Sequence, residues 1–81
     1  MGFYYVYMLR SESFPERFYT GMTSDLGTRL QAHNSGSVPH TSKYKPWKIE
    51  IAIAFPTKPK ATAFETYLKS HSGRAFAAKH F

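Results

Sequence analysis

The chain of 81 residues is 42% hydrophobic and 17% aromatic, contains no cysteine and carries a formal net charge of +6. This length predicts one domain with a thin core, and the composition indicates a packed globule and not a disordered chain. The lack of cysteine excludes disulfides and thiolate metal sites, and the four histidines lack the paired spacing of a zinc motif. The longest apolar run is too short to span a bilayer and does not resemble a signal peptide, so we expect a soluble cytoplasmic protein without membrane contact.

The positive charge lies in the second half of the chain. Residues 1–40 hold three arginines and three acidic residues, whereas residues 41–81 hold eight lysines or arginines against two glutamates. This asymmetry favours a polyanionic partner, of which nucleic acid is the commonest. A basic surface without such a partner would have the same composition, so charge alone does not decide.

Two strands and a helix are expected in the first half. Residues 3–9 are β-branched and aromatic with apolar side chains on both faces, which predicts a central strand covered on both sides. A polar turn separates them from residues 17–23, the second strand of an antiparallel hairpin. Residues 23–25 are all good N-cap types, so a helix should run from there to Asn34, with Gly36 as its left-handed cap.

The second half is expected to contain a long loop, a strand and two helices. Residues 35–47 are rich in Ser, Pro, Lys and Gly, which is typical of a functional or mobile loop. Residues 48–55 alternate between polar and apolar side chains, which predicts a third strand that should pair with the first. A threonine-capped helix over 57–70 and a short helix over 72–79 or 73–79 should follow. The order ββαβαα predicts an α+β domain in which a three-stranded, mainly antiparallel sheet is flanked by helices.

Three polar residues fall on helix faces that should be apolar. Arg29 and His33 share one face with two leucines, and Glu65 shares a face with an alanine, a phenylalanine and a leucine. Burying charge without a partner is unfavourable, so such residues usually form pairs or take part in chemistry.

Each of these residues also has a purely structural explanation. Arg29 could lay its stem along the edge of the core, Glu65 could pair with Lys69 at i+4, and His33 could satisfy the end of its helix. Tyr7 is equally well explained as a packing residue, because aromatic pairs stabilise sheets. The residues alone therefore predict a basic, aromatic-rich domain with a mixed polar cluster.

Five segments taken together resemble the GIY-YIG nucleases, in particular the small single-domain group of UPF0213 and URI-like proteins. The segments are YVY at 5–7, YTG at 19–21, TSDLGTRLQAHNSG at 23–36, KYKPWKIEIA at 43–52 and AFETYLK at 63–69. Either triplet alone means little, but the two triplets followed by this helix and the later glutamate are specific, and the resemblance covers nearly the whole chain. It departs at Tyr5 and Val6, which replace the glycine and isoleucine of the first motif, and at Thr20, which replaces the isoleucine of the second.

The resemblance implies a set of catalytic residues, and it agrees with the predicted sheet. The residues that match the family's tyrosines, helix arginine, helix histidine and metal-binding carboxylate are Tyr7, Tyr19, Arg29, His33 and Glu65. The implied reaction is phosphodiester hydrolysis with one Mg²⁺ or Mn²⁺ on Glu65. Tyr7 would be the general base with His33 relaying or taking its proton, Arg29 would bind the phosphate, and Tyr19 would orient the water or the phosphate.

The resemblance also shapes the expected partners. Lys43, Lys45 and Lys48 are expected to contact phosphates without reading sequence, and Gly21 is expected to permit a close backbone turn. The expected function is a metal-dependent endonuclease of low intrinsic sequence specificity, with DNA as the expected nucleic acid and a partner protein as the source of any specificity. The alternative is a non-catalytic nucleic-acid-binding module on the same fold.

Overall fold

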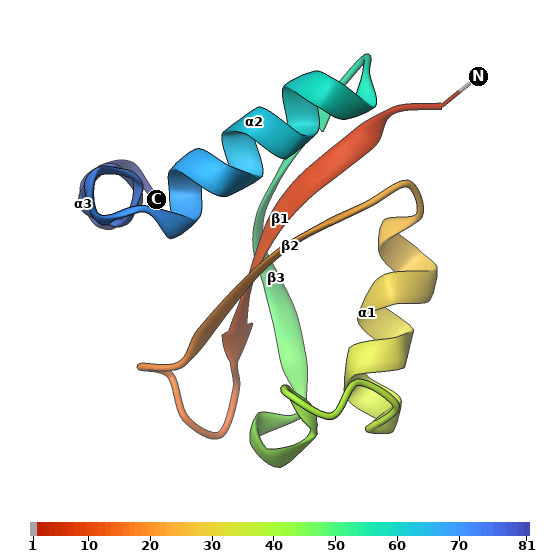
Figure 1. Ribbon diagram of the computed structural model, residues 1–81. Helices are drawn as coiled ribbons and strands as arrows, with labels where there is room; N and C mark the ends of the chain where they lie inside the picture. Colours follow the sequence, from red (N-terminus) through yellow and green to blue (C-terminus); the bar gives the residue numbers. More distant parts are fainter. Residues whose placement is uncertain (1) are drawn as a thin grey trace.

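A three-stranded antiparallel sheet lies between helices on its two faces in the computed structural model, which describes residues 2–81 (Figure 1). The strands are β1 (Tyr4–Ser11), β2 (Phe18–Thr23) and β3 (Trp47–Phe55), in the order β2-β1-β3. Both neighbours pair with β1 in antiparallel register. The α+β class, the element order and the central position of the first strand are thus confirmed.

Helices α1 (Leu26–Ser35), α2 (Lys58–Lys69) and α3 (His71–His80) cover the sheet, with α1 on one face and the other two on the opposite face (Figure 1). Because side chains alternate along a strand, β1 contributes to two cores. Val6 packs with Ala61 of α2 on one side, while Tyr7 and Leu9 pack with Trp47 on the α1 side. Both faces of the predicted strand are apolar because each face packs in a core.

Capping residues set the helix ends. The Asp25 carboxylate accepts a hydrogen bond from the Thr28 amide at 3.1 Å, and Gly36 has φ +84°, as its predicted role requires. The last helix begins at His71 and not at residue 72 or 73. It does so because the Ser70 hydroxyl accepts from the Gly73 amide, which makes Ser70 both the end of α2 and the N-cap of α3.

The segment predicted as a long loop is partly folded. It contains a short 3₁₀ helix, η1 (Ser42–Tyr44), and ends on Trp47, which is 3% exposed. The Trp47 indole N–H donates to the Thr41 carbonyl at 2.9 Å. Asn34 at the end of α1 pairs with both backbone groups of Trp47, so the segment ties α1 to the start of β3.

None of the helices in the described part of the chain is long and apolar enough to cross a membrane.

The Asn34 link predicts a stability effect. Asn34→Ala leaves the backbone N–H and C=O of buried Trp47 without these partners, so the free energy of unfolding should fall by about 1–3 kcal/mol. Urea denaturation followed by tryptophan fluorescence measures this. Gln31→Ala, on the exposed side of the same helix, is the control and should change stability by less than about 0.5 kcal/mol. Equal stability of the two variants would contradict the proposed role of Asn34.

Candidate active site

A buried hydrogen bond joins the first strand to the first helix. The Tyr7 hydroxyl lies 3.1 Å from Nε2 of His33, although the two residues are 26 positions apart. Tyr7 is 2% exposed and His33 is fully buried. The predicted helix face is therefore correct, and His33 turns toward the sheet and not toward the end of its helix.

Thr41 holds the other side of the imidazole, a contact that sequence reasoning missed. Its Oγ1 lies 2.8 Å from Nδ1 of His33, and its own proton is donated to the Val38 carbonyl at 3.3 Å. Nδ1 then carries the imidazole proton and donates to Thr41, which leaves Nε2 to accept from the Tyr7 hydroxyl. Thr41 is 1% exposed, but nothing in its local sequence distinguishes it from other loop threonines.

Tyr19 and Gly21 of β2 lie next to the Tyr7–His33 pair. The Tyr19 ring centroid lies 4.8 Å from that of His33 and 6.3 Å from that of Tyr7. Gly21 pairs with Tyr7 across the sheet, and a methyl group at Gly21 would lie 2.6 Å from the Tyr7 hydroxyl oxygen. The expected reason for this glycine, a close backbone turn, is therefore wrong. The glycine is needed because the Tyr7 ring lies directly over it.

Burial and nearby charges shift the pKa of Tyr7 in opposite directions. Burial raises the pKa of Tyr7, the Arg29 guanidinium opposes this by interacting with its hydroxyl, and Tyr19 and Glu65 raise the pKa further. The net pKa is raised, so Tyr7 is a neutral phenol near pH 7. Burial, followed by the positive charge of Arg29, lowers the pKa of His33, so the imidazole is also neutral.

Glu65 lies on the opposite side of the sheet from Tyr7 and His33. It lies on α2, which contacts β2 through Thr62, whose hydroxyl donates to the sulfur of Met22 at 3.7 Å. The Glu65 side chain is 20% exposed and pairs with Lys69 at 3.1 Å, the i+4 contact that was its structural alternative. Its charge is nevertheless close enough to raise the pKa of Tyr7. Glu65 therefore belongs to the electrostatic surroundings of Tyr7, although it lies on a helix that covers the other face of the sheet.

The donor set fits a metal ion that is shared with a substrate. No group of three or more His, Cys, Asp or Glu within residues 2–81 is arranged to hold an ion, so a closed structural metal site is absent there. Mg²⁺ keeps several waters and often takes only one or two carboxylates together with substrate phosphates. The partly exposed Glu65 carboxylate meets that requirement.

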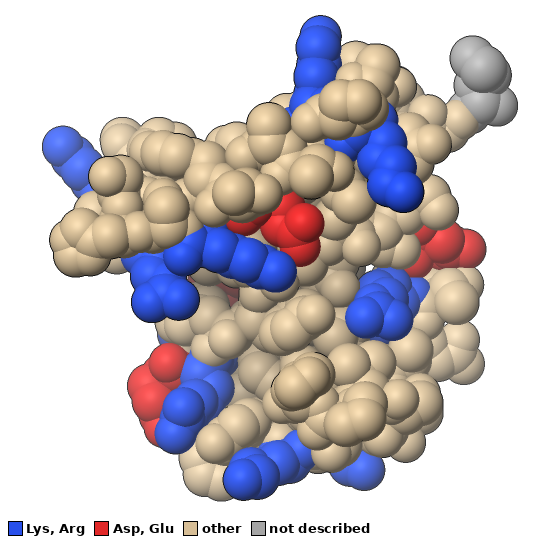
Figure 2. Space-filling model, in the orientation of Figure 1, with Lys and Arg blue, Asp and Glu red and all other residues tan. Residues whose placement is uncertain are grey.

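The three predicted phosphate-contacting lysines lie outside the buried cluster. Lys43, Lys45 and Lys48 are exposed at the end of the sheet where β3 begins, and Lys43 Nζ lies 6.0 Å from the centroid of the Tyr44 ring. Figure 2 shows that lysines and arginines also follow α2 and α3 and surround the end of the sheet below them. The role of these three lysines stays a prediction.

Known proteins resemble this chain over almost its whole length. A family model described as the GIY-YIG catalytic domain matches residues 3–79. The chain belongs to the GIY-YIG family. A UPF0213 protein of Cupriavidus pinatubonensis is 34% identical over 80 residues, which cover 94% of this chain and 87% of that protein. The solution NMR structure of a UPF0213 protein from Bacillus halodurans superposes with a TM-score of 0.56 at 29% identity, covering 95% of this chain and 83% of the other.

Longer relatives share the same domain. The "Structure-specific endonuclease subunit SLX1" of Scheffersomyces stipitis is 39% identical over 71 residues, which cover 79% of this chain. The chain spans only 21% of the length of that subunit. The similarity to SLX1 therefore concerns one domain of a longer protein.

The lowered pKa of His33 predicts a pH dependence of stability. The folded protein binds a proton at His33 less readily than the unfolded chain, whose histidine pKa is about 6.5. Stability from this group is therefore complete above that pKa and is lost as pH falls through the folded pKa. We expect the free energy of unfolding to decrease below about pH 6.5 and the His33 ring to titrate below that pH. Urea denaturation and an NMR titration measure these effects, and titration of His33 above that pH would contradict them.

The contact between Gly21 and Tyr7 predicts opposite effects at two glycines. Gly21→Ala should displace the Tyr7 hydroxyl from His33 and destabilise the fold by about 1–3 kcal/mol. Gly27→Ala is the control, because a methyl group there meets only Asp25 at 3.8 Å in an exposed part of α1. It should stabilise the protein by about 0.5–1 kcal/mol. Thermal unfolding compares the variants, and full stability of Gly21→Ala would refute the close contact.

Proposed function

We propose that this protein is a divalent-metal-dependent endonuclease that hydrolyses phosphodiester bonds in nucleic acid, with DNA as the preferred substrate. The observation that carries the proposal is the buried Tyr7–His33 hydrogen bond beside the Arg29 guanidinium, with the Glu65 charge close enough to raise the pKa of Tyr7. Neutral, hydrogen-bonded proton-transfer groups next to a cation are the arrangement by which active sites tune pKa values, which favours a catalytic role. Membership of the GIY-YIG family and the similarity to SLX1 endonuclease subunits support the same reaction.

The proton relay follows from the two neutral groups. As water attacks phosphorus, its proton passes to the Tyr7 oxygen while the Tyr7 proton passes to Nε2 of His33. The water oxygen forms the new bond to phosphorus, the bond to the leaving sugar oxygen breaks, and His33 ends the step as an imidazolium. The Thr41 hydroxyl keeps Nε2 free to accept this proton by accepting from Nδ1.

Arg29 and Glu65 act on the phosphate. The Arg29 guanidinium binds the phosphate oxygens, where negative charge develops, and its planar fork suits that geometry. Glu65 would hold Mg²⁺ or Mn²⁺, which when bound stabilises charge on the leaving oxygen. The ion pair between Glu65 and Lys69 would open when Glu65 becomes a metal ligand. Tyr19, beside His33, would orient the water or the phosphate.

Sequence specificity is expected to be low. Lys43, Lys45 and Lys48 would contact phosphates at the far end of the sheet, and phosphate contacts position a nucleic acid without reading its bases. A protein partner would therefore supply selection of defined sites. This agrees with the names of the longer relatives, which describe them as subunits of an endonuclease.

One assay tests the proposal. The protein is incubated with branched, single-stranded and duplex DNA and with RNA, with Mg²⁺ or Mn²⁺ and after metal removal by EDTA. We expect cleavage only with metal, and we expect Arg29→Ala and Glu65→Gln each to slow it by about 100- to 1,000-fold. Glu12→Gln, which removes an exposed glutamate of the β1–β2 hairpin, is the matched control and should leave the rate unchanged.

The same assay separates the enzyme from a binding module. Salt-sensitive binding without cleavage, unchanged in Glu65→Gln and Arg29→Ala, would overturn the nuclease proposal and favour a non-catalytic nucleic-acid binder. Cleavage by a folded Glu65→Gln variant at the wild-type rate would refute the metal-binding role of Glu65.

A further inference from the structure

A groove lies on the face of the sheet opposite α1, between α3 and the β1–β2 hairpin. Its volume is about 680 Å³, within the range of roughly 300–1,000 Å³ that is typical of small-ligand sites. The outline of the molecule is hollowed between these two elements in Figure 2. The buried cluster of Tyr7 and His33 lies on the other face, so the groove is a separate feature of the fold.

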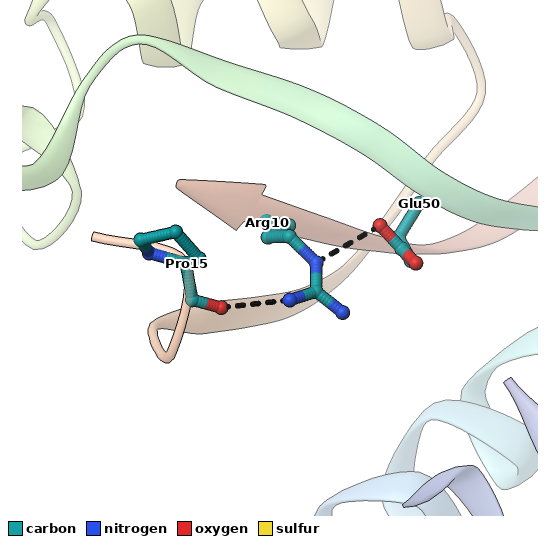
Figure 3. A network of polar contacts seen from close by, with 3 residues as sticks. All are labelled: Arg10, Pro15 and Glu50. Carbon is teal, nitrogen blue, oxygen red and sulfur yellow. Dashed lines mark hydrogen bonds and ion pairs between the residues drawn. The ribbon is translucent and has the colours of Figure 1, made fainter. Parts of the chain in front are cut away.

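On the sheet side of the groove, a guanidinium group packs against an aromatic ring. The Arg10 guanidinium lies 4.4 Å from the centroid of the Phe18 ring. Arg10 Nε donates to Glu50 at 3.1 Å and Nη1 donates to the Pro15 carbonyl at 2.9 Å, as Figure 3 shows. An arginine has five N–H donors, and these two bonds hold its plane in place while the others remain available to a ligand.

The helix side presents residues at regular helical spacing. Arg74, Ala77, Ala78 and Phe81 line the groove, at i, i+3, i+4 and i+7. Two of the large exposed hydrophobic residues, Phe18 at 46% and Phe81 at 36%, therefore border the same space.

The charges of the lining favour an anion. The lining contains three cations and one carboxylate: Arg10, Lys69, Arg74 and Glu50. The carboxylate is already paired with Arg10.

The groove adjoins the candidate active site at two points. Lys69 lines the groove and pairs with Glu65 at 3.1 Å. Tyr19 also lines it, and the Tyr19 ring contacts His33 on the other side of β2. A nucleic-acid strand whose phosphate lies between Tyr19 and Glu65 can therefore place a neighbouring nucleotide in the groove.

From these observations we infer that the groove binds an unpaired nucleotide of the nucleic-acid strand next to the cleaved bond. The inference rests on the proposed nuclease function. Aromatic and guanidinium surfaces stack on base faces, and the cations attract the flanking phosphates. Base faces are accessible only when a nucleotide leaves the duplex, so the groove selects single-stranded or branched regions.

The test measures binding without cleavage. A fluorescein-labelled oligothymidylate of about ten nucleotides, within the range that single-strand-binding domains cover, is titrated in EDTA and followed by anisotropy. Phe18→Ala should weaken binding by about 5- to 100-fold, the effect of losing one stacked base. Phe3→Ala removes an equally exposed phenylalanine away from the groove and should leave binding unchanged.

A pair of α3 variants tests the groove without removing any aromatic residue. Ala78→Glu places a negative side chain in the groove, whereas Ala75→Glu places the same side chain on an exposed position of α3 that does not line it. We expect only Ala78→Glu to weaken oligothymidylate binding, by about tenfold or more, because a like charge repels phosphate. Circular dichroism verifies that both variants are folded.

The outcomes distinguish this inference from the nuclease proposal. Loss of binding in Phe18→Ala and Ala78→Glu supports the groove even if the wild-type protein cleaves nothing. Metal-dependent cleavage together with unchanged binding in both variants would overturn the groove while the nuclease proposal stands. Equal affinity for a duplex of the same length would also overturn the inference. If the wild-type protein does not bind oligothymidylate, the inference is wrong and a protein segment becomes the better candidate for the groove.

Discussion

The hydrogen bond between Tyr7 and His33 is the contact on which the rest of the site depends. It joins the central strand to α1 inside the protein, where an unpaired hydroxyl or imidazole would be unfavourable. Its geometry requires the absence of a side chain at Gly21, which lies under the Tyr7 ring, and an acceptor at Thr41 for the second imidazole nitrogen. Strand, helix and loop are therefore linked through three side chains, with the His33 imidazole in the middle.

The edge of β2 is where the two faces of the sheet meet. An antiparallel sheet of three strands is narrow, so side chains on opposite faces can act on one substrate across an edge strand. Tyr19 packs against His33 on the α1 side, and Lys69 of α2 lines the same groove as Tyr19 and pairs with Glu65. A nucleic-acid strand along this edge would reach the proposed proton relay, the proposed metal ligand and the basic groove together.

Sequence patterns were sufficient for much of the fold and for part of the site. Helical spacing placed Arg29 and His33 toward the sheet because a period of 3.6 residues brings positions four apart onto one face. The capping residues Asp25 and Gly36 were also recognisable, because they act on backbone groups only a few positions away. The start of α3 was missed, because Ser70 ends one helix and caps the next, so that the chain has no intervening linker.

The element order, the central strand, the family and the residue types of the candidate site can be read from the amino-acid sequence. The hydrogen-bond partners of those residues and their pKa shifts follow from the folded structure alone. Thr41 is recognised as the partner of His33 only in the folded structure, in which its loop packs against α1. Gly21 is explained by the Tyr7 ring, which belongs to the neighbouring strand. The raised pKa of Tyr7 and the lowered pKa of His33 likewise arise mainly from burial. Burial and contacts between distant segments depend on the packing of all elements at once, and no local pattern encodes them.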